Sequence, residues 1–310
     1  MQIAILIATK DRPEKLDNLL LSLIQSGKYI RQVVIVSSGS NISSVIKKHS
    51  GLINLEHIHS EISGQIHQKN IGIQAIEKGV NWVLFLDDDV TLPIDSLKIL
   101  VSEYLEKPKF AKVAAFGLKV VGIKYRKYSW HTKLLLFSFY LYSNQKGKVL
   151  GSGHAQSYQD SAIDIETQWV NGISIWKLET LHSYGLVNSK LSYAAYEDVI
   201  FSYRISRNHP IIFASRVIAK SQDFDDIQPL NLNQFKSGSY MRYFFVSENQ
   251  NLSRIKLLIA QILRGIQFTL SGDKTLSGIT RFKYSMYVWF DLLRAYLFTT
   301  DPTYLLNKRF

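Results

Sequence analysis

Three consecutive carboxylates, Asp87, Asp88 and Asp89, give the sequence its clearest chemical feature. They directly follow the apolar run VLFL at residues 83–86, which is typical of a strand covered on both faces. Ligands of open α/β sheets bind beyond the carboxyl ends of strands, so these acids stand where chemistry usually occurs. Adjacent like charges repel, and a hard cation such as Mg²⁺ or Mn²⁺ compensates them and brings a phosphate-bearing substrate. A solvated acidic turn is the alternative, but the preceding strand and the following Pro93 favour a metal site.

Composition limits the class of protein. The 310 residues, 46% of them hydrophobic, suffice for one large domain or a domain with an appendage. The absence of cysteine excludes disulfides, thiolate metal sites and cysteine nucleophiles. The opening MQIAILIATKDRP has no basic leader and no cleavage site, which predicts a cytosolic protein. No segment offers the roughly 18 uninterrupted apolar residues that a membrane span needs.

Positive charge is concentrated near the end of the chain. The net charge is +12, and residues 231–310 hold 11 Lys and Arg against 4 Asp and Glu. Such an asymmetry predicts an anionic partner, either nucleic acid or an acidic membrane surface.

Strands alternate with helices in the first part of the chain. Residues 3–8 form an apolar run that leads to a helix opened by Pro13. Residues 32–36 and 53–58 are further strand candidates, and the fourth strand delivers Asp87. This order predicts an α/β fold with a mostly parallel, doubly wound sheet.

A second acidic group lies much later in the sequence. A helix is predicted within residues 192–205, with Glu197 and Asp198 near its start, where the helix dipole favours negative charge. Two more strands are predicted, at residues 111–121 and 173–176. Taken alone, the Glu-Asp pair indicates a helix cap more readily than a catalytic site.

Five segments in order carry a family resemblance. These are ILIATKDRP, SGQIHQKNIGIQ, the strand ending in DDD, WVNG and YED. Over residues 1–225 they resemble a GT-A type glycosyltransferase, most closely the inverting glycosyltransferase family 2. The resemblance implies a Rossmann-like GT-A fold with flanking helices in a catalytic domain at residues 1–228, followed by a mainly helical, basic and aromatic region at residues 229–310.

The resemblance also implies a donor site. Asp87 and Asp89 would hold Mn²⁺ or Mg²⁺ against the diphosphate of a nucleotide sugar, through the DXD motif. Lys69 stands where the family often has arginine, and lysine supplies charge without a bidentate fork. The positions implied to contact the donor are Thr9, Asp11, Ser37, Lys69, Asp88, Asn171 and Gly172.

Catalysis is implied at the later acidic pair. Asp198 matches the family's catalytic base, which takes the proton of the acceptor hydroxyl, and Glu197 would orient or assist it. An alcohol is a poor nucleophile near neutral pH, so a positioned base is worth roughly 10²–10⁴-fold in rate.

Two departures from the family pattern affect specificity and metal binding. Ser37, Ser38 and Ser40 stand where many members carry an aspartate that contacts the nucleobase. Residues 219–226 contain aspartates where relatives often supply a histidine ligand, so the third metal ligand stays open. His154 has two interpretations, a donor contact or a structural role, and a lone histidine is more often structural.

The basic tail has a predicted helix at residues 253–268. Its apolar side either packs on the catalytic domain or, with the basic and aromatic residues 281–290, contacts an anionic lipid surface. No nucleic-acid-binding motif accompanies the charge, which argues against nucleic acid as the anionic partner. The apolar positions at helical spacing are Ile255, Leu258, Ile259, Ile262, Leu263 and Ile266.

Together these features predict a metal-dependent inverting hexosyl- or deoxyhexosyltransferase. A UDP- or dTDP-sugar is the favoured donor, and the acceptor is a hydroxyl of a cell-surface polysaccharide or lipid-linked glycan. The expected location is the cytoplasm, at the inner face of the cell membrane. The alternatives are a catalytically silent glycan-binding or scaffolding subunit, and a retaining transferase or nucleotidyltransferase of similar fold.

Overall fold

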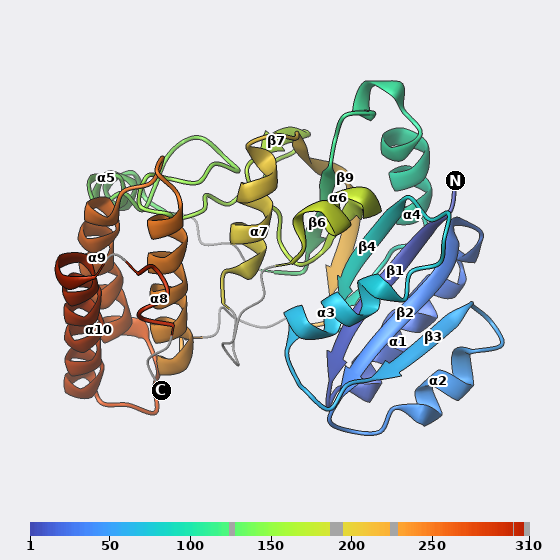
Figure 1. Ribbon diagram of the computed structural model, residues 1–310, viewed down its shortest axis with the longest axis horizontal. Coiled ribbons are helices and arrows are strands. Elements are labelled where there is room, and N and C mark those ends of the chain that lie inside the picture. Colours follow the sequence, from blue (N-terminus) through green and yellow to red (C-terminus); the bar gives the residue numbers. More distant parts are fainter. Residues whose placement is uncertain (124–127, 187–194, 224–228, 300, 307–310) are drawn as a thin grey trace. The chain divides into compact units, whose positions relative to one another are not determined.

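The computed structural model describes residues 1–123, 128–186, 195–223, 229–299 and 301–306. The chain divides into two compact units (Figure 1). Unit 1 comprises Met1–Ile123, Tyr158–Asn188 and Phe201–Asp225, and unit 2 comprises Lys124–Ser157, Ser189–Ile200 and Asp226–Phe310. The predicted α/β class with a helical C-terminal region is confirmed.

Unit 1 is built on one sheet, in which the described residues form nine strands. The path order is β3-β2-β1-β4-β8-β6-β9-β5, and β7 pairs with β9. The strands are β1 (Ile3–Lys10), β2 (Ile30–Ser38), β3 (Leu55–His59), β4 (Trp82–Asp87), β5 (Val90–Thr91), β6 (Ala115–Val121), β7 (Ile165–Thr167), β8 (Ser174–Lys177) and β9 (Ile211–Ser221).

The first half of the sheet is parallel, as the alternation of strands and helices predicted. β3, β2, β1 and β4 all run in one direction, which brings their carboxyl ends to one edge. In register, Thr9 pairs with Ser37 and Ala8 pairs with Asp87. β8 then runs antiparallel to β4 and β6, while β9 runs parallel to β6. The ends of β1, β2 and β4 therefore meet at one edge.

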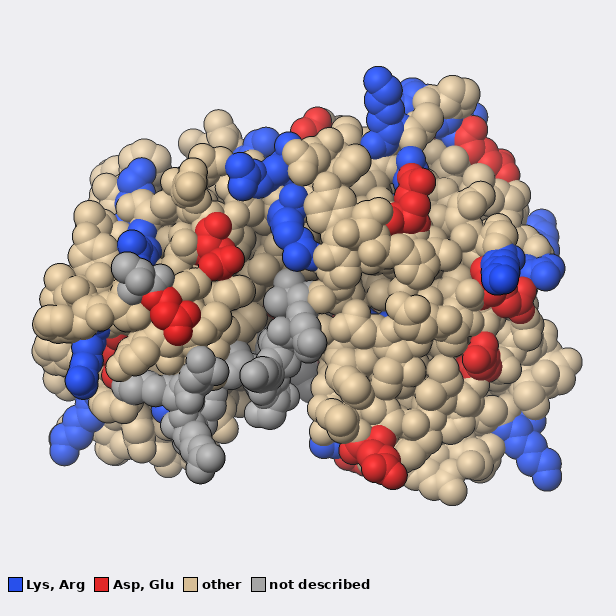
Figure 2. All heavy atoms as spheres, viewed as in Figure 1, with Lys and Arg blue, Asp and Glu red and all other residues tan. Residues whose placement is uncertain are grey.

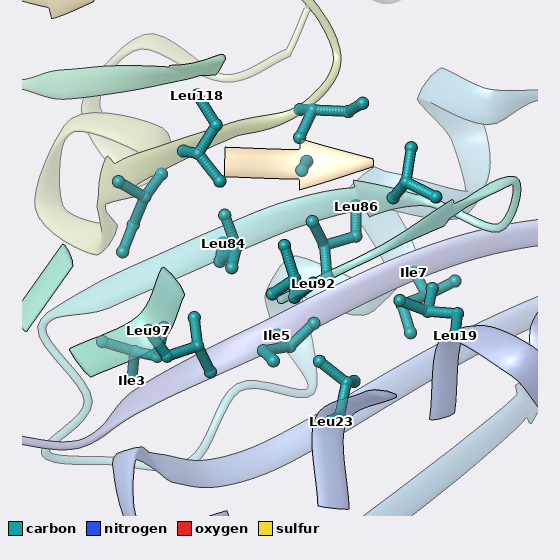
Figure 3. Packing of buried hydrophobic residues seen from close by; sticks show 14 of the residues in the cluster. Ile3, Ile5, Ile7, Leu19, Leu23, Leu84, Leu86, Leu92, Leu97 and Leu118 are labelled. Carbon is teal, nitrogen blue, oxygen red and sulfur yellow. The ribbon is translucent and has the colours of Figure 1, made fainter. Parts of the chain in front are cut away.

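Alternate residues of the central strands supply two apolar layers. Ile3, Ile5 and Ile7 of β1 face one cluster, and Ala4 and Leu6 face the other. Figure 3 shows part of the first cluster, where side chains of β1, β4 and the first helix interdigitate. The helices of unit 1 are α1 (Pro13–Ile24), α2 (Ser43–His49), α3 (Gln65–Gln74), α4 (Ser96–Ile99), which continues as a π-helical turn at Leu100–Leu105, and α6 (Leu178–Tyr184).

Unit 2 is helical in its described part. α7 (Glu197–Ser206) begins in this unit and ends in unit 1; the first three residues of its predicted segment, 192–194, lie outside the described residues. Each of the three long C-terminal helices starts at a side chain that accepts a backbone hydrogen bond, a favourable N-cap. Among the described residues, no helix is long and apolar enough to span a membrane. The other helices of unit 2 are α5 (Trp130–Ser138), α8 (Leu232–Glu248), α9 (Arg254–Ser271) and α10 (Gly278–Phe298).

Candidate active site

The three aspartates form a turn between β4 and β5, and Gln222 holds its backbone. The Gln222 N–H donates to the Asp89 carbonyl at 2.7 Å. Its side-chain amide donates to the carbonyls of Asp88 and Val90, each at 3.1 Å. Gln222 directly follows β9, so this distant strand fixes the shape of the aspartate turn.

Asp88 links the aspartate turn to the loop after β1. Its side chain is buried and accepts a hydrogen bond from the Thr9 hydroxyl at 2.6 Å. Arg12 donates to its other oxygen at 3.0 Å and lies 3.4 Å from the Asp89 carboxylate. The structure thus brings Thr9 and Asp88 together. Sequence reasoning missed Arg12, although it belongs to the ILIATKDRP segment.

The negative charge of Asp89 is compensated only in part. Its pKa is raised above the ordinary aspartate value, first by burial and then by repulsion from the carboxylates of Asp87 and Asp88. Arg12 opposes this rise only in part. A cation bound at the turn removes the repulsion, so the electrostatics of the metal-free protein favour cation binding here.

Asp89→Asn is expected to raise the melting temperature of the metal-free protein at neutral pH. A raised folded-state pKa means that ionised Asp89 destabilises the native state above that pKa, and this cost disappears as the pH falls through it. The amide removes the charge at every pH. Thermal unfolding in EDTA and in Mn²⁺ measures the effect, with the exposed Asp95→Asn as control. A lower melting temperature of Asp89→Asn in EDTA contradicts this account.

Asp87 is held from three sides within unit 1. The Gln65 side-chain amide donates to its carboxylate at 2.7 Å, and the Lys69 ammonium lies 4.0 Å away. Lys69 is buried, and its Nζ lies 5.3 Å from the centre of the Phe85 ring. A Cβ at Gly172 would lie only 3.2 Å from an Asp87 oxygen. The predicted residues Lys69 and Gly172 therefore do meet Asp87, and Gln65 joins them.

The loops after β1 and β2 are tied together by Asp11. Its carboxylate accepts hydrogen bonds from the Ser40 backbone at 2.7 Å and from the Ser40 hydroxyl at 2.5 Å. These bonds lower the pKa of Asp11, so it is a carboxylate at neutral pH. Behind them, the buried Gln68 donates to the carbonyls of Thr9 and Val36. Both loops are therefore pre-organised at the sheet edge.

Ser37 lies beside two histidines of β3 that sequence reasoning missed. Its hydroxyl is 2.8 Å from Nε2 of His57 and 3.4 Å from Nδ1 of His59. Burial and the nearby His59 lower the pKa of His57. The pairing of β2 with β3 places Ser37 opposite His59, a neighbour that a search for single motifs does not detect.

Asn171 and Gly172 form a loop before β8. The Asn171 N–H donates to the Tyr158 hydroxyl at 2.8 Å, and the Val170 N–H donates to the Ser202 hydroxyl at 3.2 Å. Tyr158 is fully buried. These contacts hold the loop where Gly172 approaches Asp87.

Glu197 and Asp198 occupy the first turn of α7, in unit 2, at the helix end that the dipole makes favourable for acids. The Val199 N–H donates to the Asp198 carboxylate at 2.8 Å. Both side chains are partly exposed. The pair therefore begins a helix as expected, and its catalytic role stays a prediction.

Tyr196 fixes the start of α7 from an unusual backbone conformation. Its φ is 81°, which lies in the left-handed region that non-glycine residues rarely adopt.

 

The Tyr196 side chain holds this φ of 81° in place. Its hydroxyl donates to the Gly153 carbonyl and accepts from the Ala155 N–H at 2.8 Å. The Arg242 guanidinium lies 4.4 Å from the centre of its ring. A left-handed φ at such a residue costs of order 1–3 kcal/mol, so these contacts must over-determine the conformation.

Tyr196→Phe is expected to lower the free energy of unfolding by about 1–3 kcal/mol, because the Gly153 carbonyl and the Ala155 N–H lose their partner. Urea denaturation measures the change. Tyr284→Phe, at an exposed position of α10, is the control. Equal stability of the two variants would show that the Tyr196 hydroxyl does not anchor α7.

His154 is buried in unit 2, and its Nδ1 lies 3.1 Å from the Ser152 hydroxyl. Burial, together with the charges of Arg242 and Arg264, holds its pKa well below the ordinary histidine value. It is therefore a neutral imidazole. Within the described part of the chain its Nε2 has no hydrogen-bond partner.

The segment that replaces the family's histidine ligand is described only to Asp223. Asp223 pairs with Lys15 at 2.5 Å and adds to the negative charge around Asp89. Asp225 and Asp226 lie outside the described residues. Within residues 219–226, Asp223 is therefore the aspartate that the structure describes, and it lies near the aspartate turn.

Comparison with known protein families decides the identity. Residues 4–164, just over half of the chain, match the family model described as Glycosyl transferase family 2. This chain belongs to glycosyl transferase family 2. A search of curated proteins found no match.

Solved structures with a GT-A type fold resemble this family 2 chain. A fragment of TarS from S. aureus, residues 1–349 with UDP-GlcNAc, has a TM-score of 0.58 at 15% identity, covering 95% of this chain and 81% of that one. Mannosyltransferase PcManGT from Pyrobaculum calidifontis, with GDP-Man and Mn²⁺, has a TM-score of 0.55 at 12% identity, covering 96% and 87%. The chain spans 44% of a longer TarS structure. These likenesses establish the fold.

The donor set of this family 2 protein suits a hard divalent cation. In the described residues, no three or more His, Asp or Glu side chains group so as to hold a metal ion. Asp87 and Asp89 nevertheless offer carboxylate oxygens, and the pKa of Asp89 is raised first by burial and then by the neighbouring carboxylates. Magnesium-like ions commonly take one or two carboxylates plus substrate phosphates and water. Two carboxylates, completed by substrate phosphate and water, therefore fit such an ion.

Proposed function

We propose that this family 2 protein is a metal-dependent inverting glycosyltransferase. It transfers a hexosyl or deoxyhexosyl group from a nucleotide sugar, with UDP- and dTDP-sugars favoured, to a hydroxyl of a cell-surface polysaccharide or lipid-linked glycan. The single observation that carries the proposal is the aspartate turn at the carboxyl end of β4, with the buried Lys69 beside Asp87 and Arg12 beside Asp88 and Asp89. Carboxylates beside the buried ammonium group of Lys69 suit the binding of a diphosphate together with a metal ion.

Residues 1–228 form the proposed donor-binding and catalytic domain. Asp87 and Asp89 would hold Mn²⁺ or Mg²⁺, which when bound would offset charge on the departing nucleotide diphosphate. Lys69 supplies positive charge to the diphosphate, and its burial strengthens that charge's effect. Asn171 and Gly172 contact the donor, Gly172 from its place beside Asp87.

The nucleoside lies over the ends of β1 and β2 in this proposal. Thr9 and Asp11 follow β1, and their loop is fixed by Asp88 and Ser40. Asp88 contacts the ribose or sugar while Thr9 and Arg12 orient it. Ser37, backed by His57, contacts the base in place of the family's aspartate.

Asp198 is the proposed catalytic base. It accepts the proton of the acceptor hydroxyl as that oxygen attacks the anomeric carbon opposite the leaving diphosphate, which inverts the configuration. Glu197, its neighbour in the first turn of α7, orients the acceptor or the base. Tyr196 positions both through the backbone at the start of α7.

The acceptor is proposed to be presented at a membrane. Residues 229–310 carry the basic excess and many of the exposed apolar side chains, which suits peripheral contact with the inner face of the cell membrane. A cytoplasmic enzyme docked there meets lipid-linked glycans where they are assembled.

Nucleotide binding tests the proposal. UDP, dTDP and GDP are each added with Mn²⁺, Mg²⁺ or EDTA, and thermal unfolding is recorded. The proposal predicts stabilisation by one nucleotide that requires the metal, about 2.7 kcal/mol at a ligand concentration of 100 Kd. Stabilisation by none of them contradicts donor binding and favours a glycan-binding or scaffolding subunit.

The stereochemistry of transfer distinguishes an inverting from a retaining transferase. Proton NMR of a transfer reaction reports the anomeric configuration of the first product. Inversion supports Asp198 as the base, whereas retention assigns the chain to a retaining mechanism.

A further inference from the structure

α9 carries two apolar sides, only one of which is buried. Leu257, Leu258, Leu263 and Phe268 are buried, whereas a second set points to solvent at the spacing of one helical stripe. The sequence placed Leu258 and Leu263 on the same side as Ile262 and Ile266, and the structure separates them. The exposed set is Ile255 at 54%, Ile262 at 43%, Ile266 at 48% and Leu270 at 76% exposure.

α10 repeats this arrangement. Ser285, Val288, Leu292 and Ala295 are buried, whereas a separate stripe of apolar side chains lies on the solvent side, three or four residues apart up to Phe290 and then seven residues on at Leu297. The stripe comprises Ile279 at 72%, Phe282 at 54%, Met286 at 37%, Phe290 at 55% and Leu297 at 58% exposure. Tyr284, Tyr287 and Phe298 of α10 are also exposed, on other sides of the helix.

Contacts with α8 place both stripes on one side of the α9–α10 pair. α8 packs on α9 through the stacked rings of Phe235 and Phe268, 4.3 Å apart. It reaches α10 through the hydrogen bond from Tyr240 to Asp291. At about 100° per residue, each exposed stripe lies on the side of its helix away from these contacts.

α9 and α10 are joined directly, so the two stripes are neighbours. The Ser285 hydroxyl donates to the Gly265 carbonyl at 3.1 Å, and the Trp289 indole donates to the Leu258 carbonyl at 3.2 Å. Both helices stand side by side in Figure 1. The two stripes thus form one apolar surface, here named the hairpin face.

The charges around the hairpin face have one sign. Lys283 and Arg294 are exposed on α10, one and four residues after the stripe positions Phe282 and Phe290. Lys256 is exposed on α9, and its ammonium lies 5.3 Å from the centre of the Tyr140 ring. Of the acids in residues 254–298, Asp291 is buried against Tyr240, and Asp273 accepts hydrogen bonds from Thr275 in the loop. On the face drawn in Figure 2, wide uncharged areas over the C-terminal helices are interrupted by single basic and acidic side chains.

We propose that the hairpin face docks on an anionic lipid surface. The apolar stripes enter the boundary between headgroups and acyl chains, and the bordering cations meet lipid phosphates. A second copy of this chain is a poorer occupant, because pairing the same face brings like charges together. The inference deepens, and rests on, the peripheral contact in the proposed function.

Vesicle sedimentation with the full chain tests the docking surface. Vesicles of phosphatidylcholine alone and with 30% phosphatidylglycerol, a fraction of the order of the anionic content of natural membranes, are compared at low and high salt. Wild type is expected to bind the anionic vesicles. Ile266→Gln with Phe290→Gln lowers the affinity about tenfold or more, because two apolar side chains no longer insert. Lys283→Gln lowers it about fivefold at low salt.

Ile94→Gln with Ile163→Gln is the matched control, since both side chains are exposed in unit 1 at 59% and 70%. The double variant Ile266→Gln with Phe290→Gln is here named the hairpin variant. If it binds anionic vesicles as tightly as the control variant does, the proposal is overturned. A second outcome also overturns it: the wild type binds no vesicles but forms a dimer in sedimentation velocity, and the variant Ile266→Gln with Phe290→Gln is a monomer. That outcome would assign the hairpin face to contact with a second copy of the chain.

The reaction itself is read separately, by donor hydrolysis in solution without vesicles. The hairpin variant is expected to cleave donor at the wild-type rate, which locates its defect in docking. Vesicle binding without donor cleavage by any variant, wild type included, would remove the proposed function and leave the docking surface standing.

Discussion

Replacing Asp198 with asparagine is expected to lower the rate of sugar transfer by about 10²–10⁴-fold while donor binding is unchanged. Asparagine keeps the shape of the side chain and an oxygen that accepts from the Val199 N–H, so the start of α7 stays folded. It cannot take the proton of the acceptor hydroxyl. Initial rates with saturating donor, and calorimetry of donor binding, measure the two quantities.

Two further variants serve as comparisons for Asp198→Asn. Glu197→Gln is expected to have a smaller effect, since its proposed role is to orient or assist the base. Asp95→Asn changes an exposed aspartate of unit 1 and is expected to leave the rate unchanged. If Asp198→Asn transfers sugar within a few-fold of wild type, another group is the base.

Asp87→Ala is expected to abolish metal-dependent cleavage of the donor, a loss of about 10²-fold or more in rate, because several kcal/mol of charge stabilisation are removed. The change also leaves Gln65 and Lys69 without the carboxylate that they contact. Activity is measured across a Mn²⁺ titration and in EDTA.

Asp87→Asn separates these two consequences. The amide oxygen still accepts from Gln65, but the negative charge that binds a cation is gone. A loss of activity as large as in Asp87→Ala assigns the effect to the metal, whereas activity near wild type in Asp87→Asn would show that Asp87 only orders the neighbouring side chains.

The parallel half of the sheet and the aspartate turn could be predicted from sequence, because they depend on local pattern. The runs that became β1 and β4 are continuous and apolar, and the carboxylates directly follow one of them. Parallel strands then bring Thr9, Ser37 and Asp87 to one edge without further information. The same logic placed Glu197 at a helix start.

The partners of the site residues could not be predicted in the same way. Arg12, Gln65 and Gln222 are ordinary polar residues, and their roles arise from contacts between segments far apart in sequence. Gln222 lies more than 130 residues from the turn that it holds. Nothing local distinguishes such a glutamine from a solvated one.

The C-terminal helices show a second limit of sequence patterns. Spacing in α9 predicted an apolar helix but merged its buried and exposed sides, because isoleucine and leucine fit either environment. Which neighbour covers a helix depends on tertiary packing. Residues 124–157 belong to the same compact unit as these helices, a grouping that sequence composition did not indicate. The functional division at residue 228 stays a prediction.

Hydrolysis of nucleotide sugars is the measurement that tests the central claim most directly. Purified protein is incubated with a panel of UDP-, dTDP- and GDP-sugars in Mn²⁺, Mg²⁺ or EDTA, alongside Asp87→Ala and Asp198→Asn. The account predicts metal-dependent release of one nucleotide, lost in both variants. No turnover of any donor, even with detergent and lipid-linked acceptors present, would contradict it.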